Sequence, residues 1–110
     1  MNVTWEYIEN QNGTWNVRFL NVEGEYELSG GYLLQCVGVI HEIDFYFRAK
    51  DQEWEFETND EKGWLFPAAD RRAFQRQGRY KQNNGLPNEK AAEIIAACVA
   101  EFLNQLTSPL

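Results

Sequence analysis

The chain is poor in the residue types that build catalytic and metal sites. It has one histidine, His41, and two cysteines, Cys36 and Cys98, among 110 residues. Neither cysteine belongs to a CxxC pair or to a Cys/His spacing of the kind that holds zinc. Both lie in apolar runs, where a free thiol behaves as a small buried hydrophobe. We therefore expect two buried thiols, no metal site, no cofactor and no catalytic set.

Long apolar stretches and a leader pattern are missing as well. The apolar runs fall far short of the roughly 20 residues that a membrane helix needs. The first residues, Met1 to Glu6, contain neither the basic region nor the apolar core of a signal peptide. The sequence thus predicts a cytoplasmic protein that does not bind membranes.

Positive charge is scarce and unevenly spread. Ten Lys and Arg against 17 Asp and Glu give a formal net charge of −7. Residues 1–62 hold 13 acidic and 4 basic side chains, whereas residues 63–86 hold one acidic and five basic side chains. An acidic protein repels phosphate backbones, so we expect no nucleic-acid partner. The acidic half of the chain instead suits contact with a basic protein.

Alternation of apolar and polar residues predicts strands through the first half of the chain. An Asn-Gly dipeptide between two such runs is typical of a hairpin. A three-residue loop at 11–13 pairs Tyr7 with Val17 and Trp5 with Phe19. This register brings both apolar sets to one face, whereas a two-residue loop would point them in opposite directions. We therefore expect the three-residue loop.

The following segments extend the predicted sheet. A short third strand is expected at 25–28, and the nearly all-apolar run 32–40 predicts a central strand that is covered on both faces or crosses the core. His41-Glu42 is a candidate turn. A second hairpin closes at Asp51-Gln52, which pairs apolar residues on one face and opposite charges on the other: Phe47 with Phe56, Ala49 with Trp54, Arg48 with Glu55, and Lys50 with Glu53.

The pattern changes after Gly63, where helices are expected. Pro67 can open a short helix near 68–77, which Gly78 would end. A second, strongly amphipathic helix is predicted at 89–106, with an apolar stripe that includes Ile95, Val99 and Phe102. The chain thus predicts a single α+β domain over 1–110. Its antiparallel sheet of five to six strands, spanning 3–59, packs against the C-terminal helix.

Two charged clusters are the candidate binding sites. Acidic ladders at Glu25 and Glu27 and at Glu53, Glu55 and Glu57 are interpreted as a solvated face or as a docking surface for a basic partner. Trp64 is added as an exposed aromatic that would mark an interface. The arginine row Arg72, Arg76 and Arg79 follows helical spacing and is a candidate anion site, although docking on the acidic ladders is favoured.

The preferred functional hypothesis is a small acidic non-enzymatic binding module that docks on a basic protein, such as an inhibitor or an immunity-type protein. One alternative is a small-molecule or anion-binding domain with a pocket between sheet and helix. A second is an enzyme that uses His41 with Glu42, Asp44 or Cys36. Strand edges at the N-terminal hairpin or near Glu25 could also pair two copies into a homodimer.

Overall fold

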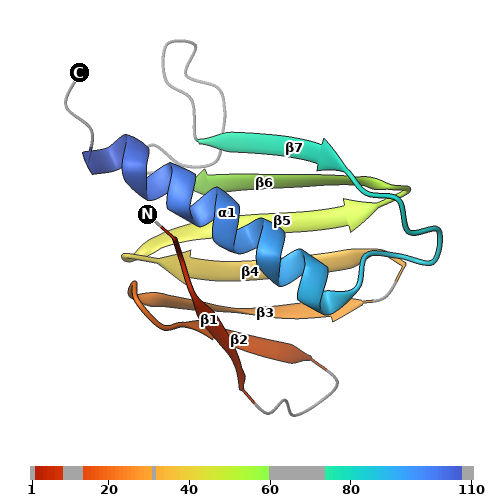
Figure 1. Ribbon diagram of the computed structural model, residues 1–110, viewed down its shortest axis with the longest axis horizontal. Coiled ribbons are helices and arrows are strands. Elements are labelled where there is room, and N and C mark those ends of the chain that lie inside the picture. Colours follow the sequence, from red (N-terminus) through yellow and green to blue (C-terminus); the bar gives the residue numbers. More distant parts are fainter. Residues whose placement is uncertain (1, 9–13, 31, 60–73, 108–110) are drawn as a thin grey trace.

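The computed structural model describes residues 2–8, 14–30, 32–59 and 74–107, except for the side chains of residues 106 and 107. It shows an antiparallel sheet and one C-terminal helix, which confirms the α+β expectation (Figure 1). Seven strands pair in chain order, more than the five or six expected. They are β1 (Trp5–Ile8), β2 (Trp15–Phe19), β3 (Gly24–Gly30), β4 (Leu34–Ile40), β5 (Ile43–Lys50), β6 (Glu53–Asn59) and β7 (Gln75–Arg79), followed by α1 (Asn88–Thr107).

Both predicted hairpin registers are confirmed. In the first, Tyr7 pairs with Val17 and Trp5 with Phe19. The expected loop at 11–13 lies outside the described residues. In the second, every expected pair is present, including Phe47 with Phe56 on one face. The registers are set because each strand must bring its apolar side chains to the same face as its neighbour.

Two tight turns form without glycine. His41 and Glu42 have φ of 48° and 68°, and Asp51 and Gln52 have φ of 54° and 66°. Two successive residues with positive φ make a two-residue hairpin turn whose twist matches that of the flanking strands. The candidate turn at His41-Glu42 is therefore confirmed. The sheet holds non-glycine residues in a backbone region that they seldom adopt.

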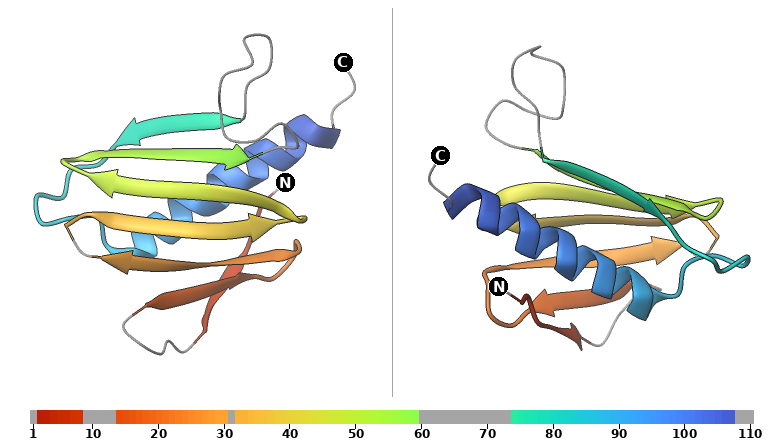
Figure 2. Two further views of the ribbon diagram at one scale, coloured as in Figure 1. Left: turned by 180° about the vertical axis from the view of Figure 1, so that it is seen from behind. Right: turned by 45° about the horizontal axis from the view of Figure 1, so that its top comes forward.

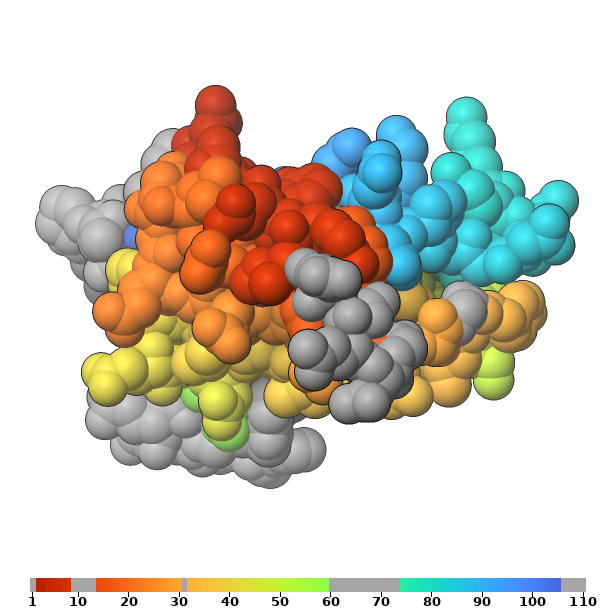
Figure 3. All heavy atoms as spheres, turned by 90° about the horizontal axis from the view of Figure 1, so that it is seen from below, coloured from red at the N-terminus to blue at the C-terminus, as the bar shows by residue number. Residues whose placement is uncertain are grey.

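The helix α1 packs across one face of the sheet (Figure 1). It begins and ends within one residue of its expected bounds. Ile95 and Val99 have no exposed surface, and neither have Phe45, Phe47 and Phe56 of the sheet. Seen from the β1 end, the side chains of β1 to β3 lie next to those of α1 (Figure 3). The core is therefore the layer between sheet and helix.

Among the described residues, no element covers the opposite face of the sheet, which we call the open face. Viewed from behind, the strands lie in front and α1 lies behind them (Figure 2). On the central strand β4, Leu34 and Cys36 are buried. Val37, the residue after Cys36, points to the other face and is 62% exposed. The expectation that 32–40 is covered on both faces is thus wrong. Among the described residues, no helix combines the length and apolarity that crossing a membrane requires.

The prediction of a short helix near 68–77 is wrong for the part of this range that the structure describes. Residues 75–77 belong to strand β7, and residues 68–73 lie outside the described part of the chain. Backbone hydrogen bonds hold β7 on β6, because Thr58 N–H donates to Phe74 and Tyr80 N–H donates to Gln52, both at 3.0 Å. Without β7, β6 would present an unpaired edge, and pairing of that edge outweighs the weak helical pattern.

Candidate docking face

The open face carries the side chains that alternate with the core residues along each strand. Two registers define its centre. Glu27, Val37, Tyr46 and Glu57 lie opposite one another on β3, β4, β5 and β6. One step along the strands, Glu25, Val39 and Asp44 lie opposite one another on β3, β4 and β5. We call Val37, Val39 and Tyr46 the apolar strip, and Glu25, Glu27, Asp44 and Glu57 the acidic frame.

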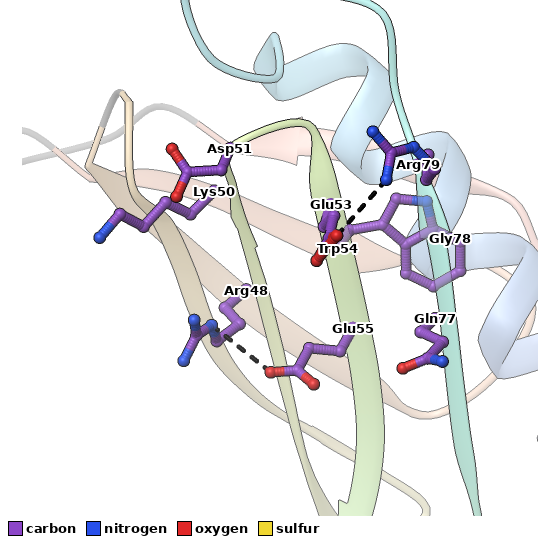
Figure 4. Close-up of a pocket in the computed structure, with 9 residues that line it drawn as sticks. All are labelled: Arg48, Lys50, Asp51, Glu53, Trp54, Glu55, Gln77, Gly78 and Arg79. Atoms are coloured by element: carbon purple, nitrogen blue, oxygen red, sulfur yellow. Dashed lines mark hydrogen bonds and ion pairs between the residues drawn. The ribbon is translucent and has the colours of Figure 1, made fainter.

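The part of the open face near the Asp51-Gln52 turn is neutralised within the chain. Arg48 Nε lies 3.5 Å from Glu55 Oε1, and Arg79 Nη1 lies 3.4 Å from Glu53 Oε2. These pairs line a groove in which Lys50 and Asp51 add one charge of each sign (Figure 4). The acidic ladder at Glu53 and Glu55 therefore has arginine neighbours, one of them from β7.

The acidic frame has no such neutralisation. None of its four carboxylates forms an ion pair with a described residue. Arg18, which is opposite Glu25 in the sheet, forms its ion pair with Glu6 at 2.7 Å; the pKa of Arg18 is raised mainly by Glu6 and to a smaller extent by the charge of Glu25. The pKa of Glu57 is raised above its ordinary value, first by burial and then by the negative charge of Glu55. Ionisation of Glu57 in the folded protein therefore costs free energy.

An exposed apolar surface lies inside the acidic frame. Val37 is among the most exposed large apolar side chains of the described chain, and Val39 and Tyr46 are half-buried. The two valines and three of the acids, Glu25, Glu27 and Asp44, line a shallow hollow on this face. Apolar surface rimmed by polar groups is typical of a protein-binding site.

The structure brings all five predicted glutamates, Glu25, Glu27, Glu53, Glu55 and Glu57, onto this one face. Trp64 lies outside the described residues. Sequence reasoning missed Asp44 and the two valines of the apolar strip as parts of this face. The signal was present, because a strand with one open face should not carry valines at two successive open positions. The nearly all-apolar run favours instead a strand that is covered on both faces or that crosses the core.

The predicted arginine row is not formed. Arg72 lies outside the described residues. Arg76 is opposite Phe56 and Arg79 is opposite Glu53, so the alternation of β7 places these two side chains on opposite faces of the sheet. Arg76 contacts Glu101 of α1 at 2.9 Å, whereas Arg79 contacts Glu53. The two guanidinium groups therefore do not share one anion site on β7.

The thiols and the histidine do not form a reactive pair. Cys36 is 2% exposed, and burial raises its pKa well above the ordinary value. Cys98 is also buried, and its pKa is raised to about 12. His41 is exposed in the turn that follows β4, five residues and about 16 Å along the extended chain from Cys36. The expectation of two buried thiols is confirmed.

The remaining chemistry of the described residues is limited. Within the described ranges, no three of the His, Cys, Asp and Glu side chains gather as a metal site would require. The layer between sheet and helix is occupied by Phe45, Phe47, Phe56, Ile95 and Val99, which have no exposed surface. Side chains thus fill the centre of the layer between sheet and helix, and a hollow lies at its margin, between Trp5 and the Ala96 and Ala100 positions of α1.

Strand position also limits the homodimer expectation. Glu25 lies on β3, which is hydrogen-bonded to β2 on one side and to β4 on the other. The strand near Glu25 therefore has no free edge, and the prediction that two copies pair there is wrong. The edge of the N-terminal hairpin is β1, an outer strand of the sheet, and pairing there stays a prediction.

Comparisons of the chain with family models, with curated proteins and with solved structures returned no match.

Proposed function

We propose that the protein is a non-enzymatic binding module that docks a basic protein on its open sheet face. The observation that carries this proposal is the acidic frame, four carboxylates without an ion-pair partner among the described residues, around the exposed apolar strip. A partner with apolar side chains at the centre of its surface and Lys or Arg at the rim would complement this arrangement.

The contrast with the rest of the face supports the proposal. Glu53 and Glu55 form ion pairs within the chain, with Arg79 and Arg48 respectively. The described residues supply no such partner to Glu27 or Glu57. The pKa of Glu57 is raised first by burial and then by the charge of Glu55, and a cation brought by a partner would offset the second of these effects.

The sign of the charge selects the class of partner. Unpaired carboxylates repel phosphate groups, so a polyanion does not suit this face. They attract a basic protein, raise its association rate and fix its orientation. An inhibitor or immunity-type role, in which a small acidic protein covers a basic target, is one form of this function.

Charge reversal on the face tests the proposal. Immobilised wild-type protein and the double variant Glu27→Lys, Glu57→Lys would be exposed to a lysate of the source cells at low and high salt. We expect the wild type to capture a basic protein at low salt and to release it at high salt. With that protein purified, we expect the variant to bind at least about tenfold more weakly by titration calorimetry, because two attractions become repulsions.

A second double variant, Glu89→Lys, Glu93→Lys, is the matched control. Both residues are exposed on α1, away from the sheet face, and the change in net charge is identical. Binding by the control should stay close to that of the wild type. Equal losses in both variants would mean that net charge alone governs capture, and the proposal would then be wrong. Finding no salt-sensitive basic partner would also overturn it.

A further inference from the structure

The width of the site between its two acidic margins matches one secondary-structure element. Glu25 and Glu27 lie on β3 and Asp44 lies on β5, two strands away, with β4 between them. Two strand spacings amount to about 10 Å. An α-helix with its side chains is about 10 Å across, so a helix laid along β4 would have Glu25 and Glu27 on one side and Asp44 on the other.

The spacing along β4 matches the same element. Val37 and Val39 are two residues apart on one strand, a separation of about 7 Å. Side chains four residues apart on a helix are separated by about 6 Å. Apolar residues at i and i+4 of a docked helix would therefore rest on the two valines. Glu25 and Glu27 have the same spacing and would face basic residues at i and i+4 of one flank.

The backbone of the sheet excludes an extended segment at this place. The backbone of β4 is paired with β3 and β5, so the face offers side chains but no free backbone groups to a partner. A segment whose own N–H and C=O groups become buried on the apolar strip must satisfy them internally. A helix does so, whereas a single extended strand does not.

We infer that the element docked on this face is a basic amphipathic helix, lying along β4 with Lys or Arg on both flanks of its apolar stripe. This inference rests on the proposed function and specifies the partner of the same site. The helix would cover the open face as α1 covers the other, and would complete a three-layer arrangement of helix, sheet and helix.

Two synthetic peptides of one composition distinguish the helix from other basic segments. Each has about 16 residues of Leu, Lys, Arg and Ala, a length of roughly 24 Å as a helix. One places Leu at i, i+4 and i+8 with basic residues on both flanks, and the other alternates Leu and basic residues as a strand would. Binding would be followed by two-dimensional NMR of the isotope-labelled protein, and peptide helicity by circular dichroism.

We expect the helical-period peptide to bind at least about tenfold more tightly than the strand-period peptide. The amides of Val37, Val39 and Tyr46 should shift most, and the peptide should gain helicity on binding. The variant Val37→Ser should weaken this binding several-fold. Leu20→Ser, at an exposed apolar residue in the loop between β2 and β3, is the matched control and should not.

The possible failures separate the two proposals. Equal binding of both peptides at the acidic frame, abolished by Glu27→Lys with Glu57→Lys, would overturn the helix and keep the basic partner. Absence of any shift with the helical-period peptide at millimolar concentration would also overturn the helix, whether or not the charge-reversal variant loses a captured protein. Shifts confined to residues outside β3 to β6 would contradict both.

Discussion

Phe45 lies directly over Gly38, its neighbour across β4 and β5. A Cβ atom at position 38 would lie 2.5 Å from Cζ of Phe45 and 2.5 Å from Cβ of Tyr26, closer than atoms can approach. The aromatic ring thus occupies the space that a side chain would take, and covers a backbone segment that glycine leaves bare. Trp54 has the same relationship to Gly78, where a Cβ would lie 2.6 Å from the indole.

The two glycines should differ in their tolerance of alanine. Phe45 has no exposed surface and cannot move away, so Gly38→Ala should lower the free energy of unfolding by about 1–3 kcal/mol or more. Trp54 is half-buried near the edge of the sheet and can turn aside, so Gly78→Ala should cost less than about 1 kcal/mol. Urea denaturation of both variants measures the difference. Equal costs would contradict this account of the two contacts.

A second prediction concerns the hydroxyl group of Tyr26. The residue is 4% exposed, its hydroxyl oxygen has no hydrogen-bond partner among the residues that the structure describes, and burial raises its pKa strongly. Leaving a polar group unpaired costs free energy, so Tyr26→Phe should leave the protein as stable as before or up to about 1 kcal/mol more stable. Tyr26→Ala, which removes the ring, should cost about 3–5 kcal/mol. Chemical denaturation would show a loss with phenylalanine if the hydroxyl were in fact satisfied.

The ion pair between Arg76 and Glu101 joins β7 to α1 and predicts a pH dependence. Arg76 Nε donates to both carboxylate oxygens of Glu101, at 2.9 and 3.0 Å, while its guanidinium lies 4.2 Å from the ring centre of Phe74. The hydrogen bond lowers the pKa of Glu101 below its ordinary value of 4.5. The resulting stabilisation is present above the unfolded-state pKa and is lost as the pH falls through the folded-state pKa.

A double-mutant cycle with Arg76→Ala and Glu101→Gln measures this contribution. Both side chains are exposed, so we expect a coupling of only about 0.2–1 kcal/mol at pH 7, which disappears once the pH is below the folded-state pKa of Glu101. The charge of Glu57 has the opposite effect on stability. Its pKa is raised, so its carboxylate destabilises the fold once it is ionised. Glu57→Gln should therefore stabilise the isolated protein at pH 7, and not at pH 3. A coupling between Arg76 and Glu101 that does not fall as the carboxylate of Glu101 is titrated with acid would contradict the assignment of this pH dependence.

The registers of two hairpins, β1 with β2 and β5 with β6, could be predicted because a one-residue slip reverses a whole face. Trp5 with Phe19 and Phe47 with Phe56 satisfy this condition in only one arrangement of each hairpin. The glutamates of the docking face followed from the same alternation. The alternation does not show which of these glutamates lack an ion-pair partner among the described residues. The partner of Glu53 is Arg79 on β7, a strand whose first three residues the sequence predicts to be helical.

The strand β7 is hidden in the sequence because its own residues carry little strand signal. Gln75–Arg79 contains no apolar side chain, and its spacing of arginines imitates a helix. Buried residues lie immediately before and after it, at Phe74 and Tyr80. The backbone bonds to β6, which no side-chain pattern reports, complete its pairing. The strand is thus specified by its neighbour more than by itself.

Proline substitution tests β7 directly. The bonds from Thr58 to Phe74 and from Tyr80 to Gln52 fix the alternation, so the N–H of Arg76 faces β6 and that of Gln77 faces away from the sheet. Proline lacks this N–H but is compatible with an edge strand at an outward position. We expect Gln77→Pro to cost less than about 1 kcal/mol of unfolding free energy. Arg76→Pro should cost about 1–3 kcal/mol more than Arg76→Ala, because it leaves a carbonyl of β6 unpaired. In a helix, Gln77→Pro would cost about 3 kcal/mol, so a loss of that size on chemical denaturation would restore the helical interpretation.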